Sequence, residues 1–426
     1  MKTRLLNILL PALVCLAAAC DDSFEFGTPT HDLDEKTDLS AGPEQVLWKK
    51  KGAVYSTKRV HNFRIPGLVR TPHKLIAFCE AREETGATNK DGGDIDLVYR
   101  VSTDGGVNWG PSQVLFDDED NTCGNACAVY TESGRLVVFC CWQRTGRTEA
   151  NFKSKYFTFD EAQTYGCQAV CFYSDDEGDT WTGPVKWFGE GRNSDESRYK
   201  WTSFLKVGPG HAIQLCSGEH RGRILVGCDH KYELFDGRAI TDTESEDYYG
   251  SHVAYSDDNG ESWHMLELDE ELHYGNECVP VELSDGRVYL DMRGTGAYKK
   301  MRGGSFSADG GISWTRYAPV PLRVDPGCQG SVVNYNTDGV PSPVILASSN
   351  DSETRDHLSI RASLDDCASW KSAVYRVTER KSGYSDMVVF EDGSIGILYE
   401  NGATHYSDQI SFRRIPAATI EKYINE

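Results

Sequence analysis

The sequence has few positive charges for its length. Its 426 residues include 44 lysines and arginines against 65 aspartates and glutamates, a formal net charge of −21. A field of this sign repels polyanions. We therefore expect no binding to nucleic acid or to an anionic membrane surface, and an anionic ligand has to be held by a local cluster of arginines.

Long amphipathic helical patterns are also missing, apart from one short helix expected at residues 417–423. From about residue 46 onward, short apolar runs alternate with turn residues, and no segment rich in proline, serine or glycine interrupts them. Asp285-Gly286 and Asp392-Gly393 lie between such runs, as hairpin turns do. We predict one all-β domain over residues 46–426. Strands are expected at residues 74–79, 95–102, 136–142, 168–174, 223–228, 287–292, 344–348, 358–362 and 387–390.

The N-terminus has the composition of an export signal. Lys2 and Arg4 precede a short apolar run that ends in three alanines and Cys20, a pattern typical of a signal peptide rather than of a membrane span. The position of Cys20 resembles the lipobox of bacterial lipoproteins, with ordinary secretion as the alternative. We predict a lipoprotein signal peptide at residues 1–19, lipidation of Cys20 and an acidic tether over residues 20–45.

An exported lipoprotein would reside at the outer membrane, on the cell surface or in the periplasm, and would meet the membrane only through its lipid anchor. Loss of residues 1–19 leaves 42 basic against 65 acidic residues, a net charge of −23.

Cysteine spacing matches no zinc site. Twelve of the 14 cysteines follow Cys20, and an even number in an exported protein permits disulfides. However, several of these cysteines lie in apolar β-like runs, and adjacent Cys140 and Cys141 would point to opposite faces of a strand. The sequence leaves both bridged and free, buried cysteines open.

One eight-residue pattern, Ser-x-Asp-x-Gly-x-x-Trp, recurs along the chain. Its four intact copies begin at Ser102, Ser174, Ser256 and Ser307, and a fifth copy beginning at Ser363 has Cys367 in place of glycine. Serine and aspartate can bond the backbone of a tight turn, glycine can take a positive φ, and tryptophan can pack the turn onto a sheet. The starts lie 72, 82, 51 and 56 residues apart, which is the scale of a four-stranded propeller blade with insertions. We therefore predict a β-propeller in which these residues form structural turns.

Several arginines occupy apolar or strand-end positions. Arg64 stands in Phe63-Arg64-Ile65-Pro66, where a buried arginine is costly unless it is paired. Arg82, Arg293 and Arg355 lie in comparable settings. Each alone is typical of a solvated surface residue, but together around a propeller they fit a clamp for a carboxylate.

The Arg64-Ile65-Pro66 motif followed by the repeats, which that family calls Asp boxes, resembles the exo-α-sialidase (neuraminidase) superfamily over about residues 55–420. The resemblance implies a six-bladed β-propeller. It also implies a glycoside hydrolase that releases terminal α-linked sialic acid from glycoproteins, glycolipids and oligosaccharides with retention of configuration. Its partners would be sialylated glycans. We expect a monomer that needs no cofactor and no catalytic metal, with a structural calcium left open.

The family's functional residues can be matched to this chain one by one. The resemblance implies a carboxylate clamp of Arg64, Arg293 and Arg355, with Glu400 orienting the first of these arginines. It implies Tyr384 as nucleophile, Glu277 as its partner, and Asp91, eleven residues before Ser102, as acid and base. Arg82 and Asn125 would contact the N-acyl and O4 side of the sugar.

Two positions depart from the pattern. Asp94 and Asp96 follow Asp91 in the same acidic segment and are alternatives to it. Some bacterial relatives place an aspartate where this chain has Asn125, which leaves the fine substrate preference open.

A tyrosine nucleophile agrees with the chemistry of sialic acid, whose anomeric carbon carries a carboxylate. A carboxylate nucleophile at ~4 Å would meet a repulsion of about 4 kcal/mol at an effective dielectric near 20. A neutral tyrosine avoids this repulsion, and a neighbouring glutamate can accept its proton. Tyrosine is the known exception to the rule of two carboxylates in glycosidases.

Two other functions fit parts of the same sequence. A sialic-acid-binding propeller without turnover would need the arginines but not Tyr384, Glu277 or Asp91. A trans-sialidase or an intramolecular trans-sialidase would keep all of them. Linkage preference depends on insertions such as residues 149–164 and 233–249, whose conformations the sequence does not predict.

Overall fold

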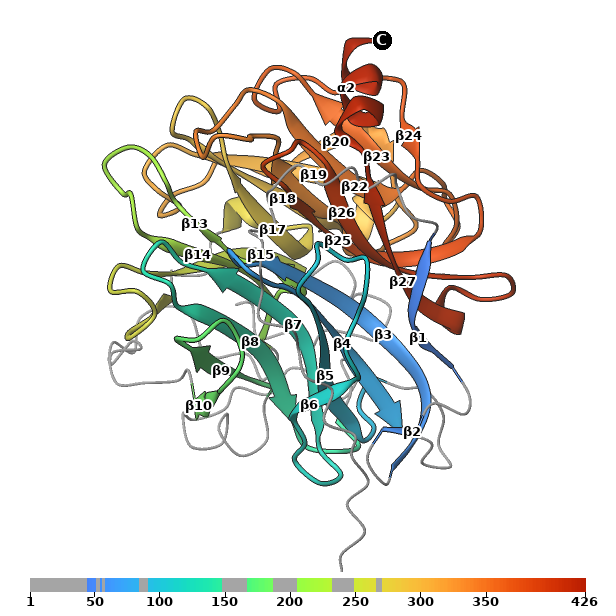
Figure 1. Ribbon diagram of the computed structural model, residues 1–426. Coiled ribbons are helices and arrows are strands. Elements are labelled where there is room, and N and C mark those ends of the chain that lie inside the picture. The colour runs from blue at the N-terminus through green and yellow to red at the C-terminus, as the bar shows by residue number, and fades with distance from the viewer. Residues whose placement is uncertain are drawn as a thin grey trace, which may run out of the picture. The chain divides into compact units, whose positions relative to one another are not determined.

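The computed structural model describes residues 44–50, 54–55, 58–83, 91–147, 167–186, 205–231, 249–265 and 270–426. All of these residues belong to one unit, residues 31–426. This part of the chain consists of strands, the 3-10 turns η3 (Glu270–Leu272), η4 (Gly296–Tyr298) and η5 (Tyr406–Asp408), and the C-terminal helix α2 (Ala417–Asn425) (Figure 1). The prediction of an all-β protein is confirmed. Within these ranges no helix is both long and apolar enough to cross a membrane.

Four sheets stand as separate blades in the described residues. The first consists of β1 (Gln45–Lys49), β27 (Gln409–Ile415), β26 (Ile395–Gly402) and β25 (Lys381–Val389). The second consists of β11 (Leu205–Val207), β14 (Ile224–Lys231), β15 (Tyr249–Ser256) and β16 (His264–Met265), with β13 (Ile213–Gln214) added to β14. The third consists of β17 (Gly275–Glu282), β18 (Val288–Gly294), β19 (Met301–Ser307) and β20 (Ala318–Val324). The fourth consists of β21 (Ser331–Asn334), β22 (Ile345–Asn350), β23 (Leu358–Ser363) and β24 (Tyr375–Arg376).

The prediction of six blades is wrong, because the remaining ten described strands form one continuous sheet. A parallel bridge between Ile95 and Thr122 joins β5 to β7 within this sheet. The spacing of turns within blades carries no information about such a bridge between neighbouring strand groups. The ten strands are β2 (Val54–Tyr55), β3 (Lys58–Arg70), β4 (Leu75–Glu83), β5 (Ile95–Ser102), β6 (Gln113–Phe116), β7 (Thr122–Tyr130), β8 (Leu136–Gln143), β9 (Gln168–Ser174), β10 (Thr182–Lys186) and β12 (Gly210–His211).

The strands predicted from the sequence coincide with strands of the structure. Residues 95–102 and 168–174 are β5 and β9, and the other seven ranges fall within or overlap β4, β8, β14, β18, β22, β23 and β25. The helix predicted at residues 417–423 forms the greater part of α2. Short apolar runs bounded by turn residues were therefore sufficient to locate these strands.

The five repeats form the same turn. In each, the serine Oγ accepts a hydrogen bond from the backbone N–H four residues later, at 2.7 to 2.9 Å. That later residue takes a positive φ: 90° at Gly106, 85° at Gly178 and Gly260, 89° at Gly311 and 63° at Cys367. The cysteine of the fifth copy thus adopts a backbone conformation that favours glycine.

Tryptophans of these turns join neighbouring parts of the fold. The ring of Trp109, after β5, lies 5.1 Å from that of Phe412 on β27. The ring of Trp263, after β15, lies 4.7 Å from that of Phe139 on β8. These two repeats therefore fasten their own sheets to another sheet by aromatic packing, whereas Trp181, after β9, packs on Phe78 and Tyr99 of its own sheet.

The strands that carry the cavity described below share an irregularity. The register shifts between Arg64 and Gly67 of β3, between Gly124 and Cys127 of β7, between Gly275 and Cys278 of β17, and between Ser382 and Ser385 of β25. β-bulges of this kind bend a strand and re-aim its side chains. Four strands are thus bent at corresponding positions.

Candidate active site

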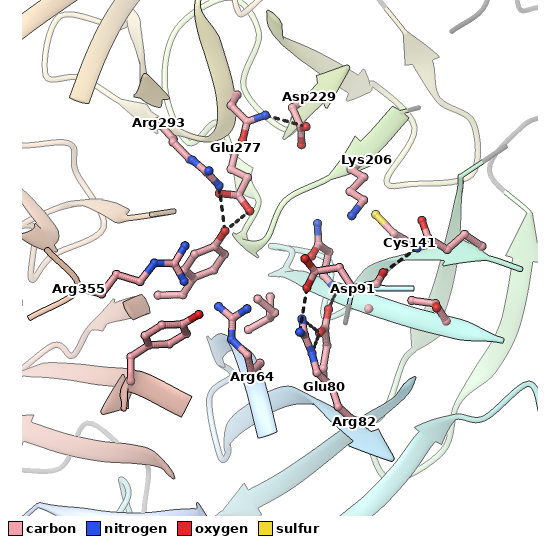
Figure 2. A pocket seen from close by; sticks show the side chains of 18 residues that line it. Arg64, Glu80, Arg82, Asp91, Cys141, Lys206, Asp229, Glu277, Arg293 and Arg355 are labelled. Atoms are coloured by element: carbon pink, nitrogen blue, oxygen red, sulfur yellow. Dashed lines mark hydrogen bonds and ion pairs between the residues drawn. The ribbon is translucent and has the colours of Figure 1, made fainter. Parts of the chain in front are cut away.

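A cavity of about 210 Å³ opens where these bulges meet (Figure 2). Eight residues predicted from the sequence line it: Arg64, Arg82, Asp91, Asn125, Glu277, Arg293, Arg355 and Tyr384. They come from β3, β4, β7, β17, β18 and β25 and from two connecting segments. The structure therefore brings together side chains that are far apart in the chain.

Glu400, the ninth predicted residue, lies behind Arg64 and is fully buried. Arg64 donates through Nε and Nη2 to the two carboxylate oxygens of Glu400, at 2.9 and 3.2 Å. The backbone N–H groups of Ile65 and Tyr384 also donate to this carboxylate, at 2.9 and 3.2 Å. Burial alone would lower the pKa of Arg64, but Glu400 together with Tyr384, Tyr406 and Asp91 outweighs burial and raises that pKa well above its usual value. The arginine is thus charged, paired and fixed in orientation.

Tyr384 and Glu277 form a close pair at the cavity wall. The Tyr384 hydroxyl donates to Glu277 Oε1 at 2.6 Å. Arg293 Nη1 donates to Glu277 Oε2 at 2.9 Å and to the Tyr384 oxygen at 3.1 Å. Burial and the charge of Glu277 raise the pKa of Tyr384 well above its usual value, against the opposing effect of Arg293, Arg355 and Arg64. The tyrosine is therefore neutral in the empty cavity and has a proton acceptor in contact.

Arg355 is held differently from Arg64 and Arg293. Its Nη2 donates to the backbone oxygen of Gly327 at 3.2 Å, and within the described ranges it has no carboxylate partner. Its Cζ atom lies 4.5 Å from the ring centre of Tyr406 and 5.7 Å from that of Tyr384. Tyr406 also lines the cavity, and no motif in the sequence distinguished it from the other tyrosines.

On the opposite side, Arg82 is bound by two carboxylates. Its Nε and Nη2 donate to Glu80 Oε2 at 2.8 and 2.6 Å, and its Nη1 lies 2.8 Å from Asp91 Oδ1. Asn125 donates from its backbone N–H to Glu80 Oε1 at 3.0 Å. Glu80 was missed in the sequence, although its spacing of two from Arg82 on a strand places both on one face.

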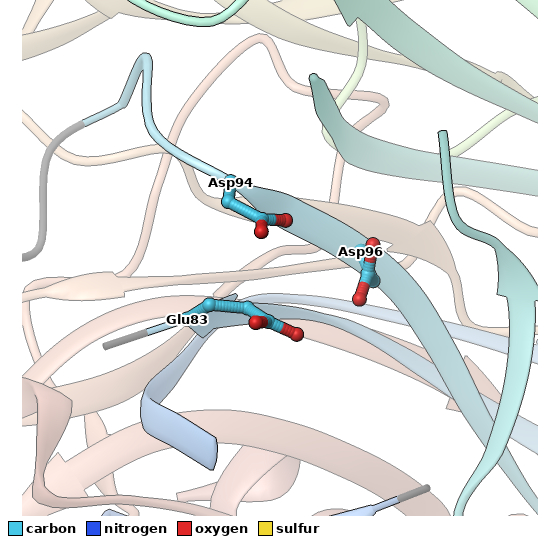
Figure 3. Close-up of side chains that lie close together, drawn as sticks. All are labelled: Glu83, Asp94 and Asp96. Atoms are coloured by element: carbon cyan, nitrogen blue, oxygen red, sulfur yellow. The ribbon is translucent and has the colours of Figure 1, made fainter. Parts of the chain in front are cut away.

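The structure separates Asp91 from its two alternatives. Asp91 lines the cavity and its side chain is 60% exposed. Asp94 and Asp96 are buried and gather with Glu83, all three offering oxygens within 4.8 Å of one another (Figure 3). Neither is among the residues that line the cavity, so geometry favours Asp91 as the acid that a bound ligand would contact.

The charge state of Asp91 reflects its neighbours. Burial would raise its pKa, but the cations Arg82, Arg64 and Lys206 outweigh burial and hold the pKa well below its usual range. Asp91 is therefore ionised in the empty cavity.

Lys206 is a further residue that the sequence did not reveal. Other polar lining residues missed in the sequence are Thr122, Gln143, Asp229 and Asn276.

The cysteines of the described residues are free, and eleven of these twelve are buried. Cys141 and Cys140 belong to different core clusters, as expected for adjacent residues of a strand. The predictions for residues 1–19, Cys20 and the tether up to residue 43, and those for the insertions at 149–164 and 233–248, lie outside the described residues.

Comparison with known proteins shows which family the chain resembles. The model of the BNR repeat-like domain family matches residues 73–397. An exo-α-sialidase of Arthroderma benhamiae is 26% identical over 361 residues, covering 80% of this chain and 78% of that protein. A sialidase of Paraclostridium sordellii is 28% identical over 425 residues, covering 95% of each chain. A sialidase of Micromonospora viridifaciens is 30% identical over 380 residues, covering 85% of this chain and 53% of that protein.

Solved structures share the fold. The Hadza microbial sialidase Hz136 superposes with a TM-score of 0.66 at 23% identity, covering 84% of this chain and 66% of that one. The intramolecular trans-sialidase of Ruminococcus gnavus superposes with the same TM-score at 20% identity, covering 84% and 95%. Since the family model spans most of the chain, this protein belongs to the BNR repeat-like domain family, among the sialidases.

Proposed function

We propose that this exo-α-sialidase releases terminal sialic acid from sialylated glycans by a retaining mechanism with Tyr384 as nucleophile. The observation that carries the mechanism is the contact of the Tyr384 hydroxyl with Glu277 Oε1 at 2.6 Å, in a cavity that also presents the three arginines of the expected clamp. A protonated tyrosine with an adjacent carboxylate is the arrangement that a nucleophile with its general base requires.

Substrate binding begins with the carboxylate of sialic acid. Arg64 and Arg293 already have carboxylate partners in Glu400 and Glu277, whereas Arg355 has none among the described residues. The carboxylate of a bound substrate would be that partner for Arg355. Planar guanidinium groups bind carboxylates through charge-assisted, bidentate hydrogen bonds, so the three arginines would fix the sugar with its anomeric carbon facing Tyr384.

In the first chemical step, the Tyr384 oxygen forms a bond to the anomeric carbon as its proton passes to Glu277 Oε1. The glycosidic bond breaks, and Asp91 gives a proton to the departing oxygen. For this, Asp91 must be protonated, although the nearby cations favour its ionised form. A bound substrate carboxylate would offset the charge of Arg64 and so raise the pKa of Asp91 when the acid is needed.

In the second step, the ionised Asp91 removes a proton from water. The water oxygen attacks the anomeric carbon, and Tyr384 leaves and recovers its proton from Glu277. Two displacements at one carbon retain its configuration. The same residues would also serve an intramolecular trans-sialidase, in which a hydroxyl of the sugar replaces the water.

We further propose that the protein acts outside the cell as a lipid-anchored monomer. The sequence supports the anchor: the export-signal pattern of residues 1–19 lies directly before Cys20, and a polar, acidic segment separates Cys20 from β1. Labelling with a radioactive fatty acid and loss of the label in Cys20→Ser would test the anchor.

The mechanism is tested by release of methylumbelliferone from its α-sialoside. We expect turnover by the wild type and a loss of at least about a hundredfold in Tyr384→Phe and Asp91→Ala. Tyr335→Phe is the matched control, because it removes a hydroxyl hydrogen bond to Gly393 outside the cavity and should leave turnover unchanged.

Mass analysis of the product distinguishes hydrolysis from intramolecular transfer, since the anhydro sugar is lighter by one water. Sialic acid binding without any turnover would favour the non-catalytic binding propeller. Full activity in Tyr384→Phe would refute the assignment of the nucleophile.

A further inference from the structure

Tyr406 lines the cavity but has no role in the proposed mechanism. It begins the 3-10 turn η5 (Tyr406–Asp408), between β26 and β27. Its ring centre lies 4.5 Å from the Cζ atom of Arg355 and 5.1 Å from that of Arg64. The faces of aromatic rings attract cations at these distances. One ring thus contacts two guanidinium groups of equal charge.

The two guanidinium groups differ in what else holds them. Arg64 is fixed by both oxygens of Glu400. Arg355, within the described residues, donates one hydrogen bond, to the backbone oxygen of Gly327. An arginine side chain with a single neutral partner has many rotamers available. The rings of Tyr406 and Tyr384 are therefore the groups that restrict Arg355, and the Tyr406 ring is the nearer by 4.5 against 5.7 Å.

The turn that carries Tyr406 is itself fixed. The backbone N–H groups of Thr404 and His405 both donate to Asp408 Oδ2 at 3.0 Å, and Ser407 donates from its backbone to His405 Nδ1 at 3.2 Å. Lys50 forms an ion pair with the other oxygen of Asp408. Reciprocal capping of this kind sets the backbone of a short helical turn. The position of the ring is thus determined before any ligand binds.

The ring also packs closely on the strand of the proposed nucleophile. A Cβ atom placed on Gly383 would lie 3.3 Å from Tyr406 Cδ2, so the ring lies against the backbone beside Tyr384. The ring therefore lies between this strand and the two arginines.

We propose that Tyr406 is a positioning residue whose ring holds Arg355 in place to receive the substrate carboxylate. This inference rests on the proposed function, in which Arg355 binds that carboxylate. The carboxylate is bound in the ground state and in the transition state alike. Loss of the ring should therefore raise KM and leave kcat nearly unchanged.

The test compares Tyr406→Leu with Tyr406→Phe. We expect KM for the methylumbelliferyl sialoside to rise about tenfold in Tyr406→Leu and to stay near the wild-type value in Tyr406→Phe, which keeps the ring. The second measurement is the affinity for 2,3-didehydro sialic acid and for its methyl ester. Only the free acid should lose affinity in Tyr406→Leu, because the ester has no charge for Arg355 to bind.

Tyr255→Leu is the matched control. The ring centre of Tyr255 lies 4.4 Å from Arg223 Cζ, a similar stacking outside the cavity, and its removal should leave KM and both affinities unchanged. Equal loss for the acid and the ester, or an equal loss in Tyr406→Phe and Tyr406→Leu, would overturn the role of the ring. A wild-type protein that neither cleaves nor binds would instead refute the proposed function, on which the inference depends.

Discussion

At the scale of the residue, charge pairing determines what each arginine of the cavity can do. Arg64 and Arg82 are buried, and each is matched by a buried glutamate, which offsets much of the cost of removing a guanidinium from water. Arg355 has no such partner in the described part of the chain. We therefore expect an anionic ligand to be bound through Arg355, beside the paired Arg64.

A pH measurement tests the influence of Lys206 on Asp91. The charge of Lys206 lowers the pKa of Asp91, so its removal in Lys206→Met should raise that pKa. If Asp91 acts as an acid once substrate is bound, the alkaline limb of the kcat profile follows the pKa of Asp91 in the substrate complex. We expect this limb to move to higher pH in Lys206→Met.

The control for this measurement is Lys74→Met, which removes an ion pair with the exposed Asp179 away from the cavity. An unmoved alkaline limb in Lys206→Met would show that Asp91 is not the group that titrates there.

The sequence was sufficient for some of these residues and not for others. Arg64 could be predicted because an arginine between Phe63 and Ile65 demands a buried partner. The role of Tyr406 could not, because it depends on a turn after β26 meeting side chains from β3 and from the segment before β23. The roles of Asp91, Glu277 and Tyr384 came from family resemblance, and their catalytic function remains a prediction.

At the scale of the element, the irregular positions of the strands are as informative as the regular ones. Short apolar runs between turn residues located the strands, but the bulges that aim Glu277 and Tyr384 into the cavity have no simple sequence signal. Gly383 shows what they require, since a Cβ atom there would lie 2.1 Å from Glu400 Oε2. The close approach of a buried carboxylate to the backbone explains the glycine.

The fifth repeat allows a test of backbone conformation. Cys367 takes a φ of 63°, where a residue with a Cβ atom costs roughly 1 kcal/mol more than glycine. We therefore expect Cys367→Gly to be more stable than Cys367→Ala by about 1 kcal/mol in urea denaturation.

Cys79 provides the opposite case, because it is buried in β4 with an ordinary strand conformation. There the glycine variant should be less stable than the alanine variant by about 0.5–1 kcal/mol. The same order of stabilities at both positions would contradict the explanation.

At the scale of the whole described unit, the two ends of the domain share one sheet. β1 pairs with β27, which pairs with β26, and β26 pairs with β25. Glu44, just before β1, accepts hydrogen bonds from Tyr399 at 2.7 Å and from Gln409 at 3.1 Å. The sheet that holds Tyr384 and Glu400 is thus completed by the first strand of the domain.

Removal of this strand should weaken the fold. Leu47 and Trp48 are buried in it, and loss of both side chains from the core should cost about 4 kcal/mol. We expect a chain that starts at residue 50 to unfold at a lower urea concentration than one that starts at residue 44. If the shorter chain does not fold, Trp48→Ala in the full chain should show the same shift to a smaller extent. Equal midpoints would show that β1 does not stabilise the unit.

The pairing of β1 with β27 also orders events during synthesis. The ribosome synthesises β1 before the other described strands and β27 after them. The backbone groups of β1 that bond to β27 therefore stay unpaired until almost all of the chain has emerged. The sheet with Tyr384 and Glu400 is therefore the last of the described sheets to close, because β26 gains its second neighbour only when β27 is made. We therefore expect sialidase activity to appear only after β27 has joined this sheet, and a chain that stops before residue 409 to release no sialic acid.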